Sequence, residues 1–185
     1  MKLDQKDRYI IANQLKILEA LYPDEAGSYA IQRTAFEEGY ESHYSWAMEN
    51  ISKSVLSESD AREVLDTLDM FSALQRSYNA LVDKSGLNEY SIKFRGYDGN
   101  NTVECKLLGY ARYFVVELNR FQELLTDQKE YFDFNSHGEM RETYKRMLDK
   151  WQEIPAGIEP GKKHNLTKEQ LITISAASVH PRNRD

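Results

Sequence analysis

The stretch VECKLLGYARYFVVELNRFQELL, residues 103–125, decides the fold class of this chain. Its apolar residues recur at intervals of four or three positions, which is the period of an α-helix. They are Val103, Leu107, Tyr110, Phe114, Leu118, Phe121 and Leu125. Charged residues are sparse between Cys105 and Leu118, so this helix is expected at the centre of the fold or at a subunit interface.

Two residues inside this helix need an explanation. A mid-helix glycine costs about 1 kcal/mol relative to alanine, so Gly109 predicts that another backbone approaches closely there. Arg112 has aliphatic neighbours, and a charge in apolar surroundings needs a partner. We expect an ion pair with Asp98 or with an acidic residue between 37 and 69, and a ligand-binding role for Arg112 stays open.

The remaining patterns are also helical and predict an all-α protein. Helices are expected at residues 4–22, 24–38, 42–51, 57–82, 136–154 and 167–178. A short extended piece at residues 91–94 has no obvious partner strand. We expect an N-terminal helical hairpin packed on a larger helical bundle, then a short C-terminal helix after a Pro/Gly linker, forming one compact unit. The hairpin is expected at 1–52, the larger bundle at 53–154, the linker at 155–166 and the C-terminal helix and tail at 167–185.

Side-chain caps mark several of the expected helix starts. Ser57 precedes acidic residues that suit a helix N-terminus. Three segments have the spacing of a capping box, in which two side chains accept each other's backbone N–H groups. They are Asn101-x-x-Glu104, Ser136-x-x-Glu139 and Thr167-x-x-Gln170.

Gln14 lies on the apolar stripe of the first expected helix, close to Ile10, Ile11, Ile17 and Leu18. A buried amide must be hydrogen-bonded. We therefore expect Gln14 to make a hydrogen bond that fixes how the helices pack, and the alternative is a contact with a ligand or partner.

The composition describes an acidic protein of moderate size. The chain has 185 residues, 24 Lys and Arg against 30 Asp and Glu, and a formal net charge of -6. Its single cysteine, Cys105, cannot form an internal disulfide, which favours a reducing compartment. No apolar stretch approaches the roughly 20 residues that span a bilayer, and the N-terminus does not resemble a signal peptide. We expect a cytoplasmic protein that binds no membrane.

The common catalytic and cofactor motifs are absent from the sequence. It has no glycine-rich phosphate or dinucleotide loop, no serine-hydrolase elbow and no His-Glu-x-x-His. None of the histidines follows a glutamate by three residues, the spacing of di-iron sites in helical bundles. We therefore expect no metal and no cofactor, assign no catalytic residue, and favour a protein that is not an enzyme.

The loop RGYDGNN, residues 95–101, is the most suggestive place for a ligand. Its glycines, carboxylate and amides precede an expected helix N-terminus, where an anion or a cation can bind. A tight turn with a helix cap explains the same residues. The candidates for ligand or partner binding are Arg95, Tyr97, Asp98, Arg112 and His137.

The charge is unevenly distributed. Between Glu37 and Asp69, nine acidic residues stand against two basic ones, a net charge of -7. This segment repels phosphate backbones and argues against nucleic-acid binding. It fits a solvated face or a basic protein partner. Twelve tyrosines suit surfaces that are half apolar and half wet, so we also expect self-association.

Several short motifs, taken together, resemble the YfbU family of bacterial proteins. They are Asn13-Gln14, Glu38-Gly39-Tyr40, Met70-Phe71-x-Ala73-Leu74, Phe94-x-Gly96-Tyr97-Asp98, Leu108-Gly109-Tyr110 and Tyr144-x-Arg146-Met147-Leu148-x-x-Trp151. The resemblance covers roughly residues 8–152 and leaves the linker and the last helix as an extension. It implies an all-helical bacterial cytosolic protein. The family has no established biochemical activity, so the resemblance implies no catalytic residues.

Two classes of function remain. The first is a non-enzymatic interaction or regulatory protein, a homo-oligomer built partly on the helix at 103–125. The second is a small-molecule-binding protein or enzyme with a pocket near Asp98, Arg112 and His137, in which the carboxylate and imidazole act as acid and base. The missing catalytic motifs and the polarised charge favour the first.

Overall fold

A computed structural model describes residues 2–125, 133–154, 165–180 and 182. The chain divides into two compact units, Met1–Val55 and Leu56–Asp185. The described segments fold into helices joined by turns, which confirms the all-α prediction. Within these ranges, no helix is long and apolar enough to cross a bilayer.

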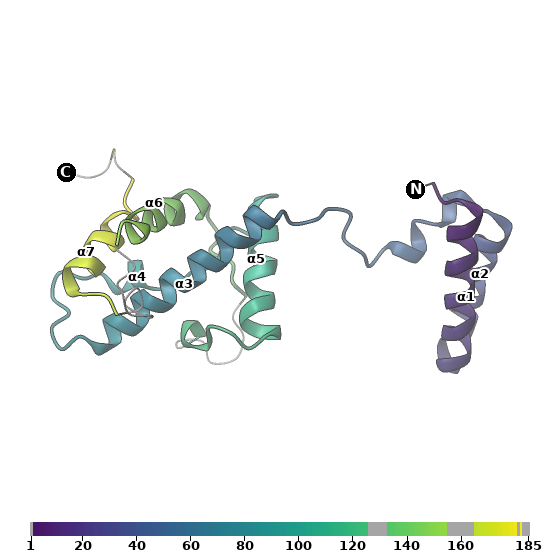
Figure 1. Cartoon of the computed structure of the whole chain (residues 1–185), viewed down its shortest axis with the longest axis horizontal. Helices are drawn as coiled ribbons and strands as arrows, with labels where there is room; N and C mark the ends of the chain where they lie inside the picture. The colour runs from purple at the N-terminus through teal and green to yellow at the C-terminus, as the bar shows by residue number, and fades with distance from the viewer. Residues whose placement is uncertain (1, 126–132, 155–164, 181, 183–185) are drawn as a thin grey trace. The chain divides into compact units, whose positions relative to one another are not determined.

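The Met1–Val55 unit is a helical hairpin (Figure 1). It consists of α1 (Gln5–Leu21), the 3₁₀ turn η1 (Pro23–Glu25) and α2 (Ala26–Glu38). Gly39 ends α2 in the left-handed conformation, with φ 77°, as glycine does at many helix C-termini. The core of the unit is small and consists of Ala12, Leu15, Phe36 and Tyr44.

The segment at 42–51 does not form the expected third helix. It contains two short 3₁₀ turns, η2 (Glu41–His43) and η3 (Trp46–Met48). Tyr44, between these turns, is buried and stacks on Phe36 with ring centroids 4.9 Å apart. So short a segment has little intrinsic helical stability, and the burial of Tyr44 decides its path instead.

The Leu56–Asp185 unit is built around α3 (Figure 1). Its α-helices are α3 (Glu58–Ala80), α4 (Glu89–Ile92), α5 (Glu104–Arg112), α6 (Arg141–Gln152) and α7 (Lys168–Ala176). The long α3 contacts the other four. The expected extended piece at 91–94 is partly the short α4, whose N-terminus is capped by the Asn88 side chain.

The C-terminal helix is an integral part of this unit. Leu171 and Ile174 of α7 are completely buried in its core. Thr167 and Gln170 form the predicted capping box at its start. Of the linker predicted at 155–166, residues 155–164 lie outside the described residues, and Leu166 is buried in the core of this unit.

The stretch 103–125 is not one continuous helix. After α5 come a π-helical turn, η4 (Tyr113–Glu117), and a 3₁₀ turn, η5 (Gln122–Leu125). Asn119 and Phe121 have φ values of 51° and 52°, which a continuing helix does not allow. The Gln122 side chain donates a hydrogen bond of 2.6 Å to the Val115 carbonyl, one of the groups that a helix end leaves without a partner.

The helix α5 also buries one face only. Leu107, Ala111 and Val115 are completely buried, whereas Tyr113 in the π turn is 47% exposed. The helix is therefore not enclosed within the chain as a central helix would be, and its place at a subunit interface stays a prediction. No atom of another described segment lies within 4 Å of the position that a Cβ at Gly109 would take, so the described residues do not make the predicted close contact.

Candidate functional site

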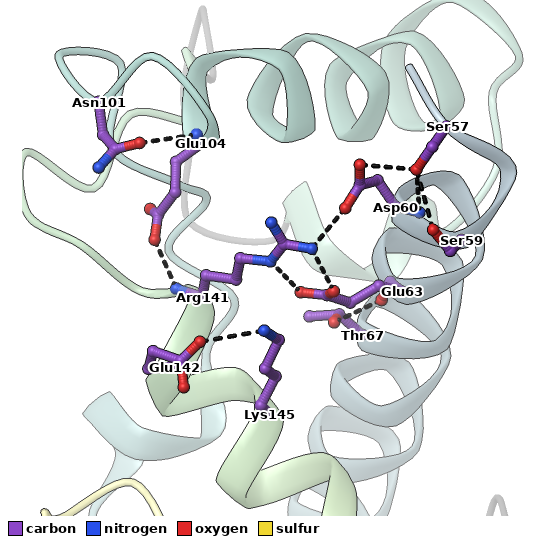
Figure 2. Close-up of polar contacts among 10 residues, drawn as sticks. All are labelled: Ser57, Ser59, Asp60, Glu63, Thr67, Asn101, Glu104, Arg141, Glu142 and Lys145. Atoms are coloured by element: carbon purple, nitrogen blue, oxygen red, sulfur yellow. Dashed lines mark hydrogen bonds and ion pairs between the residues drawn. The ribbon is translucent and has the colours of Figure 1, made fainter.

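A network of charged side chains joins the start of α3 to the start of α6 (Figure 2). The Arg141 guanidinium donates two hydrogen bonds to the Glu63 carboxylate, at 2.8 and 2.7 Å, and a third to Asp60. The Ser57 hydroxyl donates to Asp60 at 2.7 Å and accepts from its backbone N–H, as predicted for the α3 cap. The hydrogen bond from the Ser57 hydroxyl lowers the pKa of the Asp60 carboxyl most, and Arg141 lowers it further. The Glu63 carboxylate in turn raises the pKa of Arg141.

Glu104, at the start of α5, ties the same region together from the other side. Its carboxylate is 3% exposed and accepts the backbone N–H groups of Asp98 at 2.8 Å, Met140 at 2.9 Å and Arg141 at 2.7 Å. The capping box predicted at 101–104 is therefore only half formed. The Asn101 side chain accepts the Glu104 N–H at 3.1 Å, but the Glu104 carboxylate points away to another helix.

The capping box predicted at 136–139 is not formed. Helix α6 begins later, at Arg141, and its N-terminal N–H groups reach the Glu104 carboxylate. The Ser136 hydroxyl donates to the Gly138 carbonyl, while Glu139 accepts from the Asn101 side chain. A carboxylate from α5 thus replaces the local cap, at the positive end of the α6 dipole.

This network fits a structural role better than a catalytic one. Asp60, Glu63 and Glu104 each accept hydrogen bonds from within the chain, and the Arg141 guanidinium is held between two carboxylates. Such groups are already engaged and cannot act as a free acid or base. The sequence patterns gave Asp60 and Glu104 as parts of helix starts and did not predict their link to Arg141, although Asp60 and Glu63 are spaced to share a face of α3.

Tyr97 lies in the core of the larger unit rather than in a binding loop. Its side chain is completely buried, and this burial raises the pKa of its phenol. Its backbone N–H donates to the Phe134 carbonyl at 3.0 Å, and its carbonyl accepts from Ser136 at 3.0 Å. Tyr97 therefore holds the loop at 95–101 against the segment that precedes α6.

Asp98 and His137 lie in two loops that meet at Asn135. The Asn135 side chain accepts the N–H of Gly99 at 3.1 Å and that of His137 at 3.0 Å. The Asp98 carboxylate accepts the N–H of Asn100 at 2.9 Å, which closes its own turn. The His137 side chain is exposed. The contacts of both residues are those of turn structure.

The two predicted arginines have different surroundings. Arg112 is half-buried and engaged in an interaction within the chain. Arg95 lines a pocket of about 220 Å³ between α3, α4 and α6, and the lining of this pocket does not include Asp98, Arg112 or His137. Of the predicted binding residues, Arg95 is the one that the described pocket contains.

Gln14 is exposed, so the prediction of a buried amide is wrong. It lies among exposed apolar residues of α1: Ile10 is 45%, Ile17 58% and Leu21 65% exposed. We call Ile10, Gln14, Ile17 and Leu21 the α1 stripe. The four positions follow one another at intervals of four, three and four, so they share one face of the helix.

The same unit carries an apolar groove of about 280 Å³ on α2 and the turns that follow. Ile31 is 74% and Trp46 67% exposed at this groove, with Phe36 also in its lining. The His43 ring contacts the Trp46 ring edge to face, with centroids 4.4 Å apart. Apolar patches of this kind on a small unit mark interaction surfaces.

Part of the acidic segment between Glu37 and Asp69 is paired within the chain. Glu37 contacts Arg33 at 2.7 Å and Lys16 at 3.3 Å. Asp60 and Glu63 are both bound to Arg141. These pairs reduce the negative charge that a basic partner would meet.

The comparisons with known proteins point to one family. The family model described as the YfbU domain matches residues 1–177. A UPF0304 protein of Actinobacillus succinogenes is 34% identical over 157 residues, covering 85% of this chain and 92% of that protein. UPF0304 proteins of Mannheimia succiniciproducens and Pasteurella multocida are each 33% identical, over 84% and 85% of this chain and 90% and 92% of those proteins. The match through residue 177 corrects the expectation that the last helix is an extension outside the family.

Proposed function

The chain belongs to the YfbU family, and we propose that it is a non-enzymatic interaction protein that self-associates through its N-terminal hairpin. The observation that carries this proposal is the α1 stripe. A two-helix unit with a core of four residues leaves three large aliphatic side chains exposed on one helix face. Burying apolar area is the main favourable contribution to protein association.

A second copy of the chain is the partner that fits the stripe. Intervals of four, three and four read the same in both directions, so two α1 helices can pack antiparallel about a two-fold axis. This pairing sets Ile10 against the partner's Leu21 and Gln14 beside the partner's Ile17.

Gln14 also fits a specific helix pair better than a non-specific apolar patch. A single polar residue within an apolar seam fixes register and the number of chains at some cost in stability, as asparagine does in coiled coils. Gln14 occupies such a place between Ile10 and Ile17. The helix at 103–125, proposed from sequence as the oligomer contact, is less suitable because Tyr113 and Val116 lie in a π turn instead of a regular stripe.

Sedimentation velocity on the whole chain tests this proposal. We expect a wild-type dimer, or a larger assembly of dimers, and we expect Ile17→Lys to raise the dissociation constant at least about tenfold, since a lysine in the seam buries a charge. Val82→Lys is the matched control, because Val82 is an exposed aliphatic residue of the other unit. Gln14→Leu should strengthen association. A monomeric wild type, or an Ile17→Lys protein of unchanged mass, would refute the proposal.

A further inference from the structure

The Arg95 pocket of the larger unit combines a cation with an apolar floor. Its floor includes Phe71, Tyr144 and Met147, all of which are at most 2% exposed. Arg95 and Lys93 stand at its polar side, together with the hydroxyls of Ser91 and Thr143. The volume of about 220 Å³ is below the roughly 300 Å³ at which pockets for drug-sized ligands begin. It suits a ligand about as large as an amino acid.

Arg95 is held in place without a carboxylate. Its guanidinium lies over the Tyr90 ring, 4.2 Å from the centroid, and contacts the Tyr90 hydroxyl and the Met140 sulfur. Its backbone N–H donates to the Tyr144 hydroxyl at 3.2 Å. Stacking on an aromatic ring orients the guanidinium, and the N–H donors that do not contact Tyr90 or Met140 are left for a ligand.

Two other half-buried arginines bind carboxylates inside the protein, whereas Arg8 and Arg146 donate to backbone carbonyls. Arg33 binds Glu19 at 2.6 Å and Glu37 at 2.7 Å, and Arg141 binds Asp60 and Glu63. In the part of the chain that the structure describes, no carboxylate contacts the Arg95 guanidinium, and the lining of its pocket contains no acidic residue. Lys93 pairs with Glu89 at 2.7 Å, so the remaining positive charge of the pocket is that of Arg95.

Two hydroxyl groups complete the donor set. The Thr143 hydroxyl oxygen accepts from Arg146 at 3.1 Å, which leaves its own hydrogen free to be donated. Ser91 lines the same pocket from α4. We propose that this pocket binds a small organic carboxylate, whose oxygens meet Arg95 and these hydroxyls while its apolar or aromatic body lies on Phe71, Tyr144 and Met147. The site does not depend on self-association.

Titration of the full-length protein with benzoate, acetate and benzyl alcohol, followed by ¹H–¹⁵N spectra, tests the proposal. Benzoate should cause saturable shifts at Ser91, Arg95 and Thr143. It should bind at least about tenfold more tightly than benzyl alcohol, the neutral analogue, because a charge-assisted hydrogen bond contributes about 1.5 to 3 kcal/mol. Acetate should bind more weakly than benzoate, because it does not cover the apolar floor.

Substitutions then locate the binding. Arg95→Met should weaken benzoate at least about tenfold, and Arg95→Lys should weaken it less, because lysine keeps the charge and loses the planar fork. Arg62→Met is the matched control, since Arg62 is an exposed arginine of the same unit. Unchanged melting of each variant would show that it is folded. Equal binding of benzyl alcohol, the absence of saturable benzoate shifts, or full binding by folded Arg95→Met would each overturn the proposal.

Discussion

The two units of this protein differ in how far each completes its own core. In Met1–Val55 a cluster of four buried residues holds a helical hairpin, and three of the six large aliphatic residues of α1 are exposed. In Leu56–Asp185 all five α-helices contribute to one buried cluster. A short chain buries a smaller share of its surface than a long one does. The hairpin therefore gains most from a partner, whereas the larger unit can be stable by itself.

Their polar contacts differ in the same sense. The Lys16–Glu37 ion pair of the hairpin lies at its surface, where such pairs contribute little. In the larger unit, the buried Glu104 carboxylate fixes three segments at once. Specific polar contacts therefore stabilise the larger unit, and the association that we propose fits the hairpin better.

The largest expected difference between the units is in the stability that each loses when its left-handed glycine is replaced by alanine. A Cβ at Gly96, where φ is 82°, would lie 1.9 Å from the Phe134 carbonyl oxygen, which is backbone. A Cβ at Gly39, where φ is 77°, would lie 3.1 Å from the end of the flexible Arg8 side chain. We expect Gly96→Ala to cost the larger unit roughly 3 to 5 kcal/mol and Gly39→Ala to cost the hairpin about 1 kcal/mol.

Hydrogen exchange, which reports the opening of each unit separately, measures both effects. Comparable losses in the two units would mean that the segment around Phe134 yields easily. The larger unit would then not be the more rigid one.

Removal of the buried carboxylate should have the next largest effect. Glu104→Ala leaves the N–H groups of Asp98, Met140 and Arg141 without an acceptor, so we expect the larger unit to lose about 2 to 3 kcal/mol in urea unfolding. Glu142→Ala is the control, because Glu142 is 77% exposed and pairs only with Lys145, so its loss should stay within about 0.5 kcal/mol. Equal midpoints for the two variants would contradict a structural role for Glu104.

Acid should act on the larger unit through Asp60, with the smallest of the three effects. The pKa of Asp60 is lowered in the folded protein by Ser57 and then by Arg141. The stability this provides is therefore present above the unfolded pKa of about 4 and is lost as the pH falls through the lower, folded value. In Asp60→Asn this contribution to the pH dependence should be missing. If wild type and Asp60→Asn showed parallel stability curves below pH ~4, the ion pair would contribute nothing.

Much of the helical structure could be predicted because its signals are local. The starts at Ser57 and Thr167 were found from caps that act within one turn, and the apolar periods of α1, α3 and α6 gave their positions. The stretch at 103–125 was predicted wrongly, because its apolar period continues through a π turn and two residues with positive φ. The apolar period cannot show where this helix ends, because the end is capped by the Gln122 side chain, which comes from the following turn.

The binding residues could be predicted less well. Arg95 was found because it belongs to an unusual loop, but its pocket is formed by residues of α3, α4 and α6 that no local pattern connects to it. Arg112 and His137 were proposed as its companions, and the lining of the Arg95 pocket does not include them. Glu104 was found as a cap for its own helix, whereas its carboxylate serves one that begins 37 residues later.

The sequence by itself determined that this chain is helical and where most of its helices lie, because helix period and caps depend on residues within a few positions of one another. Its short motifs also determined which family it resembles. The tertiary structure decided which side of each helix faces inward. Helix α1 has apolar residues on two sides, and only the packing against α2 shows that Leu15 is buried and Ile17 is exposed. That choice depends on contacts between segments distant in the chain, and the same contacts bring Glu104 to α6 and place Arg95 in its pocket.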